Sequence, residues 1–493
     1  MTETSSIRTA ILGAGFGGIA TAVQLDRRGE RDWRLFERAA GIGGTWWHNR
    51  YPGCACDVPS HLYSLSFFPN PDWTRRFAPA AEIQAYLERA VDQFSLRGRI
   101  LLDNGIRRMQ WQADTARWHL EDDAGRHWQA EFVVLATGGL SRPAVPAIDG
   151  LDTFGGAIVH TGRWPENFDL TGKRVSVIGT GASAAQLVPA IVDRVRALSV
   201  YQRTPHWILP RPDRSISTPQ RRLYRRFPIL QKLVRFGIWL VSEARVPGLA
   251  WDNRLALAHR ALADRHRRKQ VADPDLRARL RPDFDIGCKR VILSSDWYPS
   301  LAREHVELVT TPIRKITRDA VVTNDGQTRG SDVLILATGF RATDPVPRGL
   351  IIGRDGRDLG ADWQDGPEAW RGVAVHGFPN LFLTLGPNTA LGHNSVLLMI
   401  EAQAEFIARA IAGARGEILE IAGGEQDCYN AWLQQRLAGT VWNGGGCSSW
   451  YLHPRSGKNC TLWPGFTWQY RRMMRRADPA ALHVAARGTP PST

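Results

Sequence analysis

The chain has 493 residues and a mass of 55.0 kDa, which is too large for one hydrophobic core and predicts roughly three domains. Hydrophobic residues make up 43% and charged residues 23% of the sequence; these are globular values and exclude a largely disordered chain. The formal net charge is +15. Because the arginines are spread along the chain rather than gathered in a tail, we expect an anionic small molecule as partner and no nucleic acid.

The cysteines and the apolar runs indicate a cytoplasmic protein. The cysteines show neither the paired spacing of a zinc site nor the density of a secreted scaffold, so we expect reduced thiols and no metal; they are Cys54, Cys56, Cys288, Cys428, Cys447 and Cys460. Residues 1–8 are polar, and no apolar run reaches membrane-spanning length. We therefore expect no membrane contact, although the arginines of residues 221–226 beside the apolar residues 236–241 keep surface contact open as an alternative.

A glycine-rich turn follows the first predicted strand, residues 9–12. Gly13 permits the turn, Gly15 lets backbone amides approach a pyrophosphate, and Gly18 lets the following helix, to about residue 28, pack on the strand. The next predicted strand, residues 33–36, is followed by Glu37, whose carboxylate can accept hydrogen bonds from a ribose diol. The pattern predicts a dinucleotide site.

The same pattern recurs after a second predicted strand, residues 173–178. Residues 179–184 form the turn, and a helix to about residue 196 and a strand over residues 198–202 follow. Glu37 lies 19 positions after Gly18, and Arg203 lies 19 positions after Ala184. An acid suits a free ribose hydroxyl, whereas Arg203 with Thr204 suits a 2′-phosphate. We therefore expect FAD at the first site and NADPH at the second, unless Arg203 is only a solvated arginine at a strand end.

Two further strand ends repeat, at residues 133–138 (VVLATG) and 333–339 (VLILATG), and both are typical of buried parallel strands. Between about residues 212 and 285 the strand character is lost.

The expected fold is α/β, with two doubly wound, Rossmann-like dinucleotide-binding domains and a helical insertion that caps the pocket. The predicted parts are FAD-binding 1–150 and 336–493, NADPH-binding 151–211 and 286–335, and the insertion 212–285.

The joint between the first two parts carries anchors that a flexible spacer lacks. These are Phe154, Gly156, His160, Trp164 and Pro165, and they match at every defined position the fingerprint of type I Baeyer-Villiger monooxygenases, a family that the chain resembles. Residues 43–46 (GGTW), 51–53 (YPG) and Asp57 match the family's other long motif. The resemblance covers nearly the whole chain. It implies an FAD- and NADPH-dependent enzyme that inserts one oxygen atom of O2 beside a ketone carbonyl, through a peroxyflavin, to give an ester or lactone.

The resemblance also implies residue roles. Arg290 matches the family's essential arginine, which stabilises the peroxide and the adduct with the ketone, and Asp57 matches its carboxylate partner. The alternative for Arg290 is a structural ion pair. Trp450 resembles a tryptophan on a mobile loop that closes over nicotinamide, although the residues after it depart from the loop of cyclic-ketone relatives. His160 is expected to anchor the joint rather than to act as an acid or base.

The expected cofactor contacts fall into two groups. Trp46 and Tyr63 are expected beside the flavin, unless they only pack in the hydrophobic core. Lys289 is expected to join Arg203 and Thr204 at the 2′-phosphate. The full set is Gly13, Gly15, Gly18, Glu37, Thr45, Trp46, Asp57 and Tyr63 for FAD, and Gly179, Thr180, Gly181, Ser183, Ala184, Gln186, Arg203, Thr204 and Lys289 for NADPH.

Two alternative functions stay open, a heteroatom monooxygenase and a flavin redox sensor, and the sequence argues against a third, a disulfide reductase. A flavin monooxygenase that oxygenates nitrogen or sulfur uses a similar fold and the same cofactors. A disulfide reductase needs a redox cysteine pair, which the spacing of Cys54 and Cys56 does not match. A flavin redox sensor without turnover has no need of an oxygen-activating arginine such as Arg290.

Overall fold

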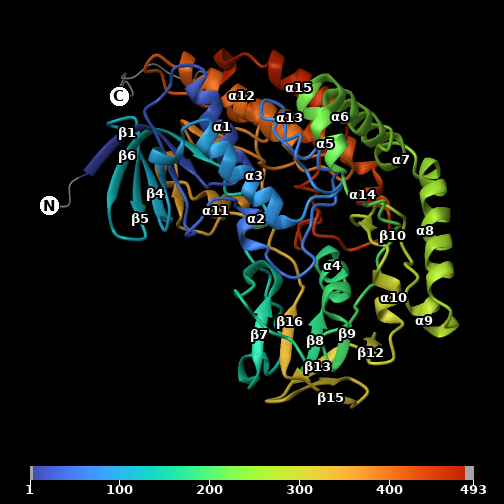
Figure 1. Ribbon diagram of the computed structural model, residues 1–493. Coiled ribbons are helices and arrows are strands. Elements are labelled where there is room, and N and C mark those ends of the chain that lie inside the picture. Colours follow the sequence, from blue (N-terminus) through green and yellow to red (C-terminus); the bar gives the residue numbers. More distant parts are fainter. Residues whose placement is uncertain (1–3, 483–493) are drawn as a thin grey trace.

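The computed structural model describes residues 4–482, which form two α/β units and a helical insertion (Figure 1). The sheet of the first unit has the strand order β17-β4-β5-β6-β1-β2-β3, with β18 beside β6. Its strands are β1 Thr4–Leu12, β2 Trp33–Phe36, β3 Ile100–Leu101, β4 Ile106–Gln112, β5 Arg117–Asp122, β6 His127–Leu135, β17 Ile351–Ile352 and β18 Leu381–Leu383. Its helices are α1 Phe16–Asp26, α2 Thr45–His48, α3 Ala80–Gln93, α11 Leu359–Asp362, α12 Leu397–Gly413, α13 Gly423–Ala438, α14 Val441–Gly444 and α15 Thr467–Arg476.

The second unit has a five-stranded sheet in the order β12-β9-β8-β16-β7, and all its pairings are parallel. Its elements are β7 Ala157–His160, β8 Arg174–Ile178, α4 Ala182–Ile191, β9 Ala197–Tyr201, α10 Trp297–Leu301, β12 Val306–Val309 and β16 Val333–Leu336, with the antiparallel strands β13 Ile313–Ile316, β14 Ala320–Thr323 and β15 Thr328–Gly330. The predicted class, α/β with two dinucleotide-binding folds, is confirmed. The joint carrying Phe154 and Trp164 contributes β7, an edge strand of this sheet.

The two repeats in the sequence have one structural cause. Gly13 and Gly179 both have φ +110°, and a Cβ added to either would lie 2.5 Å from a carbonyl oxygen, of Ala136 and Ala337 respectively. Each glycine turn therefore packs directly against an alanine-threonine-glycine strand end, which explains why both motifs are duplicated. Gly18 packs as expected, because a Cβ there would meet the Gly13 carbonyl oxygen at 1.9 Å.

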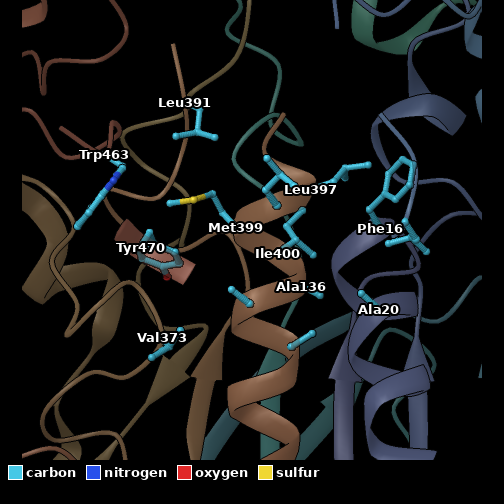
Figure 2. Packing of buried hydrophobic residues seen from close by; sticks show 14 of the residues in the cluster. Phe16, Ala20, Ala136, Val373, Leu391, Leu397, Met399, Ile400, Trp463 and Tyr470 are labelled. Carbon is cyan, nitrogen blue, oxygen red and sulfur yellow. The ribbon is translucent and has the colours of Figure 1, made fainter. Parts of the chain in front are cut away.

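The interior of the first unit lies between its sheet and two helices. Figure 2 shows α1 and α12 side by side, with Phe16 and Ala20 on α1 and Leu397 and Ile400 on α12 among the labelled core side chains. Ala20 and Leu397 are fully buried. This packing fixes the glycine turn at the start of α1 relative to the rest of the unit.

The insertion leaves and rejoins the second unit at one place, where β10 Ile208–Leu209 pairs in parallel with β11 Ile292–Leu293. Between them lie α5 Thr218–Arg226, α6 Pro228–Glu243, α7 Val246–Ala250, α8 Leu257–Gln270 and α9 Pro274–Arg279, which run along one edge of the molecule (Figure 1). No helix within residues 4–482 combines the length and the apolarity needed to span a bilayer.

One prediction about the cysteines is wrong. Cys288 and Cys447 form a disulfide across a sequence separation of 159 residues, so not all six are free thiols. The reason is tertiary: α14 and the segment after it pack on residues 287–288, and a Cβ added to Gly445 would lie 2.7 Å from the Cys288 Cβ. Spacing rules detect neighbouring cysteines along the chain and miss such a distant pair.

Candidate active site

A single cavity of about 1680 Å³ joins the two glycine turns. Almost every residue predicted to contact a cofactor lines it; Gly18 and Ala184 do not, because they are buried where α1 and α4 pack on their strands. Among the described residues, none between His206 and Lys289 lines the cavity. The prediction that the insertion caps the pocket stays a prediction; Glu243 of α6 accepts a hydrogen bond at 2.6 Å from Asn394, which lines the cavity.

The two turns are open toward the cavity. Neither α1, which begins after Gly15, nor α4, which begins after Gly181, has a side-chain cap at its N-terminus. A Cβ added to Gly181 would meet no atom within 4 Å, and one added to Gly15 would meet only the Gly44 Cα, at 3.6 Å. Uncapped backbone N–H groups with free space in front of them suit the phosphates of a dinucleotide.

The expected flavin side is lined by Glu37, Thr45, Trp46 and Tyr63. The buried Glu37 carboxylate accepts hydrogen bonds from the backbone N–H groups of Ala14 and Ala39, at 2.7 and 2.9 Å. Trp46 Nε1 donates to the Tyr63 hydroxyl at 3.2 Å, and the two rings meet edge to face. Burial raises the pKa of Tyr63, so this hydroxyl stays protonated.

The expected 2′-phosphate group of residues comes together. Lys289 Nζ donates to Thr204 Oγ1 at 2.8 Å, and burial together with the positive charge of Arg203 lowers the pKa of Lys289. All three side chains line the cavity. Two cations this close together form a site that an anion can bind.

Gln186, a predicted cofactor contact, also links two segments of the chain. It lines the cavity, but its amide donates to the Ala55 carbonyl at 2.9 Å and accepts from the Tyr51 hydroxyl at 2.9 Å. A Cβ added to Gly53 would also lie 2.5 Å from the Gln186 carbonyl oxygen. The segment before Asp57 is thus tied to α4 of the second unit.

Arg290 and Asp57 form a two-bond ion pair in the wall of the cavity. Arg290 Nε donates to Asp57 Oδ2 at 2.6 Å, and Nη2 donates to Oδ1 at 2.8 Å. Each side chain keeps 30% of its surface exposed, and both line the cavity. Burial opposes ionisation of Asp57, but the charge and hydrogen bonds of Arg290 outweigh it and lower the pKa of Asp57. The carboxylate in turn raises the pKa of Arg290, so both groups stay charged.

Sequence reasoning missed two neighbours of this pair. The Leu391 carbonyl accepts a third hydrogen bond from Arg290, from Nη1 at 3.3 Å. The buried Tyr451 interacts electrostatically with Arg290 and Asp57, and its hydroxyl has no hydrogen-bond partner within residues 4–482. Burial raises the pKa of Tyr451 to about 12. No local motif signals either residue, because both reach the site from the C-terminal part of the chain.

Comparison with known proteins decides the family. A Baeyer-Villiger monooxygenase of Pseudomonas aeruginosa is 49% identical over 97% of this chain and 91% of its own length. The chain belongs to the Baeyer-Villiger monooxygenase family. This flavoprotein monooxygenase also resembles the crystal structure of cyclohexanone monooxygenase from Rhodococcus sp. Phi1 bound to NADP+, with a TM-score of 0.86 and 29% identity over 96% of this chain and 97% of that one.

The cofactors follow from the same comparisons. The crystal structure of the OTEMO complex with FAD and NADP matches with a TM-score of 0.84 and 26% identity, covering 96% of this chain and 98% of that one. Residues 11–78 match a family model described as an NAD(P)-binding Rossmann-like domain. Residues 70–213 match the model of L-lysine 6-monooxygenase/L-ornithine 5-monooxygenase. The Baeyer-Villiger enzyme uses FAD and NADPH.

The fingerprint residues of the monooxygenase lie outside the cavity, whereas Trp450 lines it. His160 Nδ1 accepts from the Gly162 N–H at 3.0 Å, and its ring meets that of Phe340 edge to face, beside the crossing between the two units. Phe154 is buried in the second unit, and Trp164 packs on Phe168. These contacts give the fingerprint a structural part at the joint. Trp450 lies three residues after the disulfide-bonded Cys447.

Proposed function

We propose that Arg290 and Asp57 are the catalytic pair of a ketone-oxygenating reaction. The observation that supports this is the charged, two-bond pair at the edge of a cavity that runs between both glycine turns. When bound, FAD reduced by NADPH supplies the activation of oxygen.

Arg290 has donors left for the reacting atoms. A guanidinium carries five N–H groups, and Arg290 uses three of them, two toward Asp57 and one toward Leu391. The remaining N–H groups can bind a ketone oxygen and the negative charge that develops on it, which is the usual way such donors lower a barrier. Asp57 holds the plane of the guanidinium, so the donors are oriented before substrate arrives.

The 2′-phosphate of NADPH is assigned to Lys289, Arg203 and Thr204, and the pyrophosphates to the two uncapped helix N-termini. Residues 1–150 and 336–493 would hold FAD, and residues 151–211 and 286–335 NADPH. The substrates are then a small-molecule ketone and O2. A reaction that consumes NADPH fits the cytoplasm expected from the sequence.

The decisive variant is Arg290→Ala. We expect it to bind FAD and to be reduced anaerobically by NADPH, because neither step uses the guanidinium, and then to form no ester. A panel of cyclic, linear and aryl ketones, analysed for ester products by gas chromatography, tests the parent enzyme and the variant. Arg290→Ala forming ester at near the parent rate would show that the pair is only structural.

Oxygenation of nitrogen is the second candidate, since residues 70–213 match the lysine and ornithine monooxygenase model. Arg290 would then have no ketone carbonyl to bind. Lysine, ornithine and a thioether in the same NADPH assay separate the two reactions: product from these and none from any ketone would favour the second.

A further inference from the structure

Helix α6 turns its apolar side away from the protein. Ile229, Leu233, Phe236, Leu240 and Val241 are between 53% and 62% exposed. The first four recur every three or four residues and form one stripe along the helix, which Val241 widens beside Leu240. A surface helix of a globular protein normally buries such a stripe.

The inward side of α6 carries buried polar groups that are hydrogen-bonded to the rest of the protein. Gln231 donates to the Asn70 carbonyl at 2.7 Å, and Arg235 donates to the carbonyls of His61 and Ser64, both at 2.9 Å. The buried Glu243 accepts from the Asn394 amide at 2.6 Å. Rotating the helix to hide its stripe would leave these groups without partners, which is costly. The outward stripe is therefore fixed by the fold.

The apolar surface continues onto α15. Trp239 Nε1 donates to Thr467 Oγ1 at 3.0 Å, which joins α6 to the start of α15, and Trp468 on α15 is exposed. Figure 1 shows α5, α6 and α15 gathered at one corner of the molecule. We call Ile229, Leu233, Phe236, Leu240, Val241 and Trp468 the α6 face.

Positive charge surrounds the α6 face. Residues 215–242 contain no Asp or Glu, and neither does α15. The exposed basic side chains of these helices are Arg222, Arg225, Arg226, Lys232, Arg472, Arg475 and Arg476; of these, Arg225 is paired with Asp72 at 2.6 Å. A partner that fits must combine an apolar interior with negative charge at its edge.

We propose that the α6 face docks on the surface of a membrane that contains anionic lipids. The stripe enters the region between headgroups and acyl chains, while the arginines bind lipid phosphates. A second copy of this chain fits less well, because its face would bring another ring of arginines against the first. The proposal replaces the expectation of no membrane contact and is independent of the proposed function.

The test is co-sedimentation of the FAD-loaded enzyme with vesicles of phosphatidylglycerol and phosphatidylcholine, compared with phosphatidylcholine alone. We expect binding to the anionic vesicles only, weakened by salt. Leu233→Asp with Leu240→Asp should abolish it. Arg222→Glu with Arg226→Glu should weaken it at least about tenfold, since each lost basic residue near the surface weakens binding roughly fivefold. The matched control is Leu262→Asp, a 47% exposed leucine on α8, which should bind like the parent.

NADPH consumption with a ketone shows whether each variant is folded, since none of these residues lines the cavity. A parent enzyme that stays in solution with anionic vesicles overturns the proposal, as does equal loss of binding in Leu262→Asp. A dimer in light scattering that is broken by the paired Asp variant, without vesicle binding by the parent, would assign the face to a second copy and also overturn it.

Discussion

Removing the two cations of the expected 2′-phosphate site should leave the enzyme with little preference for NADPH over NADH. Lys289 and Arg203 line the same part of the cavity, and Lys289 is held by Thr204 at 2.8 Å. A hydrogen bond to a charged group is worth about 1.5–3 kcal/mol, or roughly ten- to hundredfold in affinity. We expect Lys289→Met and Arg203→Ala each to raise KM for NADPH by that factor and to leave KM for NADH little changed.

The pH dependence gives a second readout of the same site. Burial and Arg203 lower the pKa of Lys289, so the lysine loses its proton, and its hold on a phosphate, at a lower pH than an ordinary lysine. KM for NADPH should therefore rise with pH earlier than a free lysine would predict. In Arg203→Ala one of the two causes is removed, so this rise should move to higher pH.

Initial rates with both nucleotides, followed by absorbance across a pH series, measure these effects. Lys315→Met is the control, because Lys315 is an exposed lysine of the same unit that does not line the cavity. Lys289 and Arg203 are neighbours, so the effects of the two substitutions need not add up in the double variant. Equal use of NADH and NADPH by the parent, or an unchanged KM in the double variant, would refute the assignment.

Two further substitutions address the neighbours of Arg290, and a third addresses the disulfide. Asp57→Asn removes the carboxylate that orients the guanidinium; we expect at least a roughly tenfold lower kcat with a normal flavin spectrum, and an unchanged kcat would contradict this. Tyr451→Phe removes a donor beside the pair, so ester formation should slow while anaerobic flavin reduction keeps its parent rate; a slower reduction would point to a structural role instead. Cys288→Ser breaks the link to Cys447 and should cost about 2–4 kcal/mol of stability, seen as a lower Tm. Dithiothreitol should lower the Tm of the parent and leave that of Cys288→Ser unchanged, and a parent insensitive to the reductant would count against the bond.

Local patterns predicted the nucleotide folds well, because their chemistry lies in consecutive residues. The strand β2 has the predicted bounds, and β16 lies within the predicted residues 333–339 but ends at Leu336. Gly13 and Gly179, the first glycines of the two turns, have the positive φ that such a turn requires. The helix after the second turn ends at Ile191, five residues before the predicted end. The joint was interpreted as a packed segment, but only the tertiary structure shows that it adds β7 to a sheet, because a short strand of four residues carries little signal of its own.

Local sequence patterns cannot predict contacts between segments that lie far apart in the chain. Cys288 meets Cys447 only after the C-terminal part folds over residues 287–288. The inner partners of α6, such as Asn70 for Gln231 and Asn394 for Glu243, lie far away in sequence. The periodicity of α6 is that of an ordinary amphipathic helix, and nothing in it says which side meets the protein.

The pairing of β10 with β11 holds the two ends of the insertion side by side. Because the chain departs at Leu209 and returns at Ile292 on adjacent strands, the closing distance stays the same whatever lies between, and each doubling of an inserted length costs only about 0.6 kcal/mol of closure entropy. Lys289 and Arg290 lie three and two residues before Ile292, where the chain returns. An outer segment of another length can therefore be closed by the same strand pair, while Lys289 and Arg290 keep their place directly before β11.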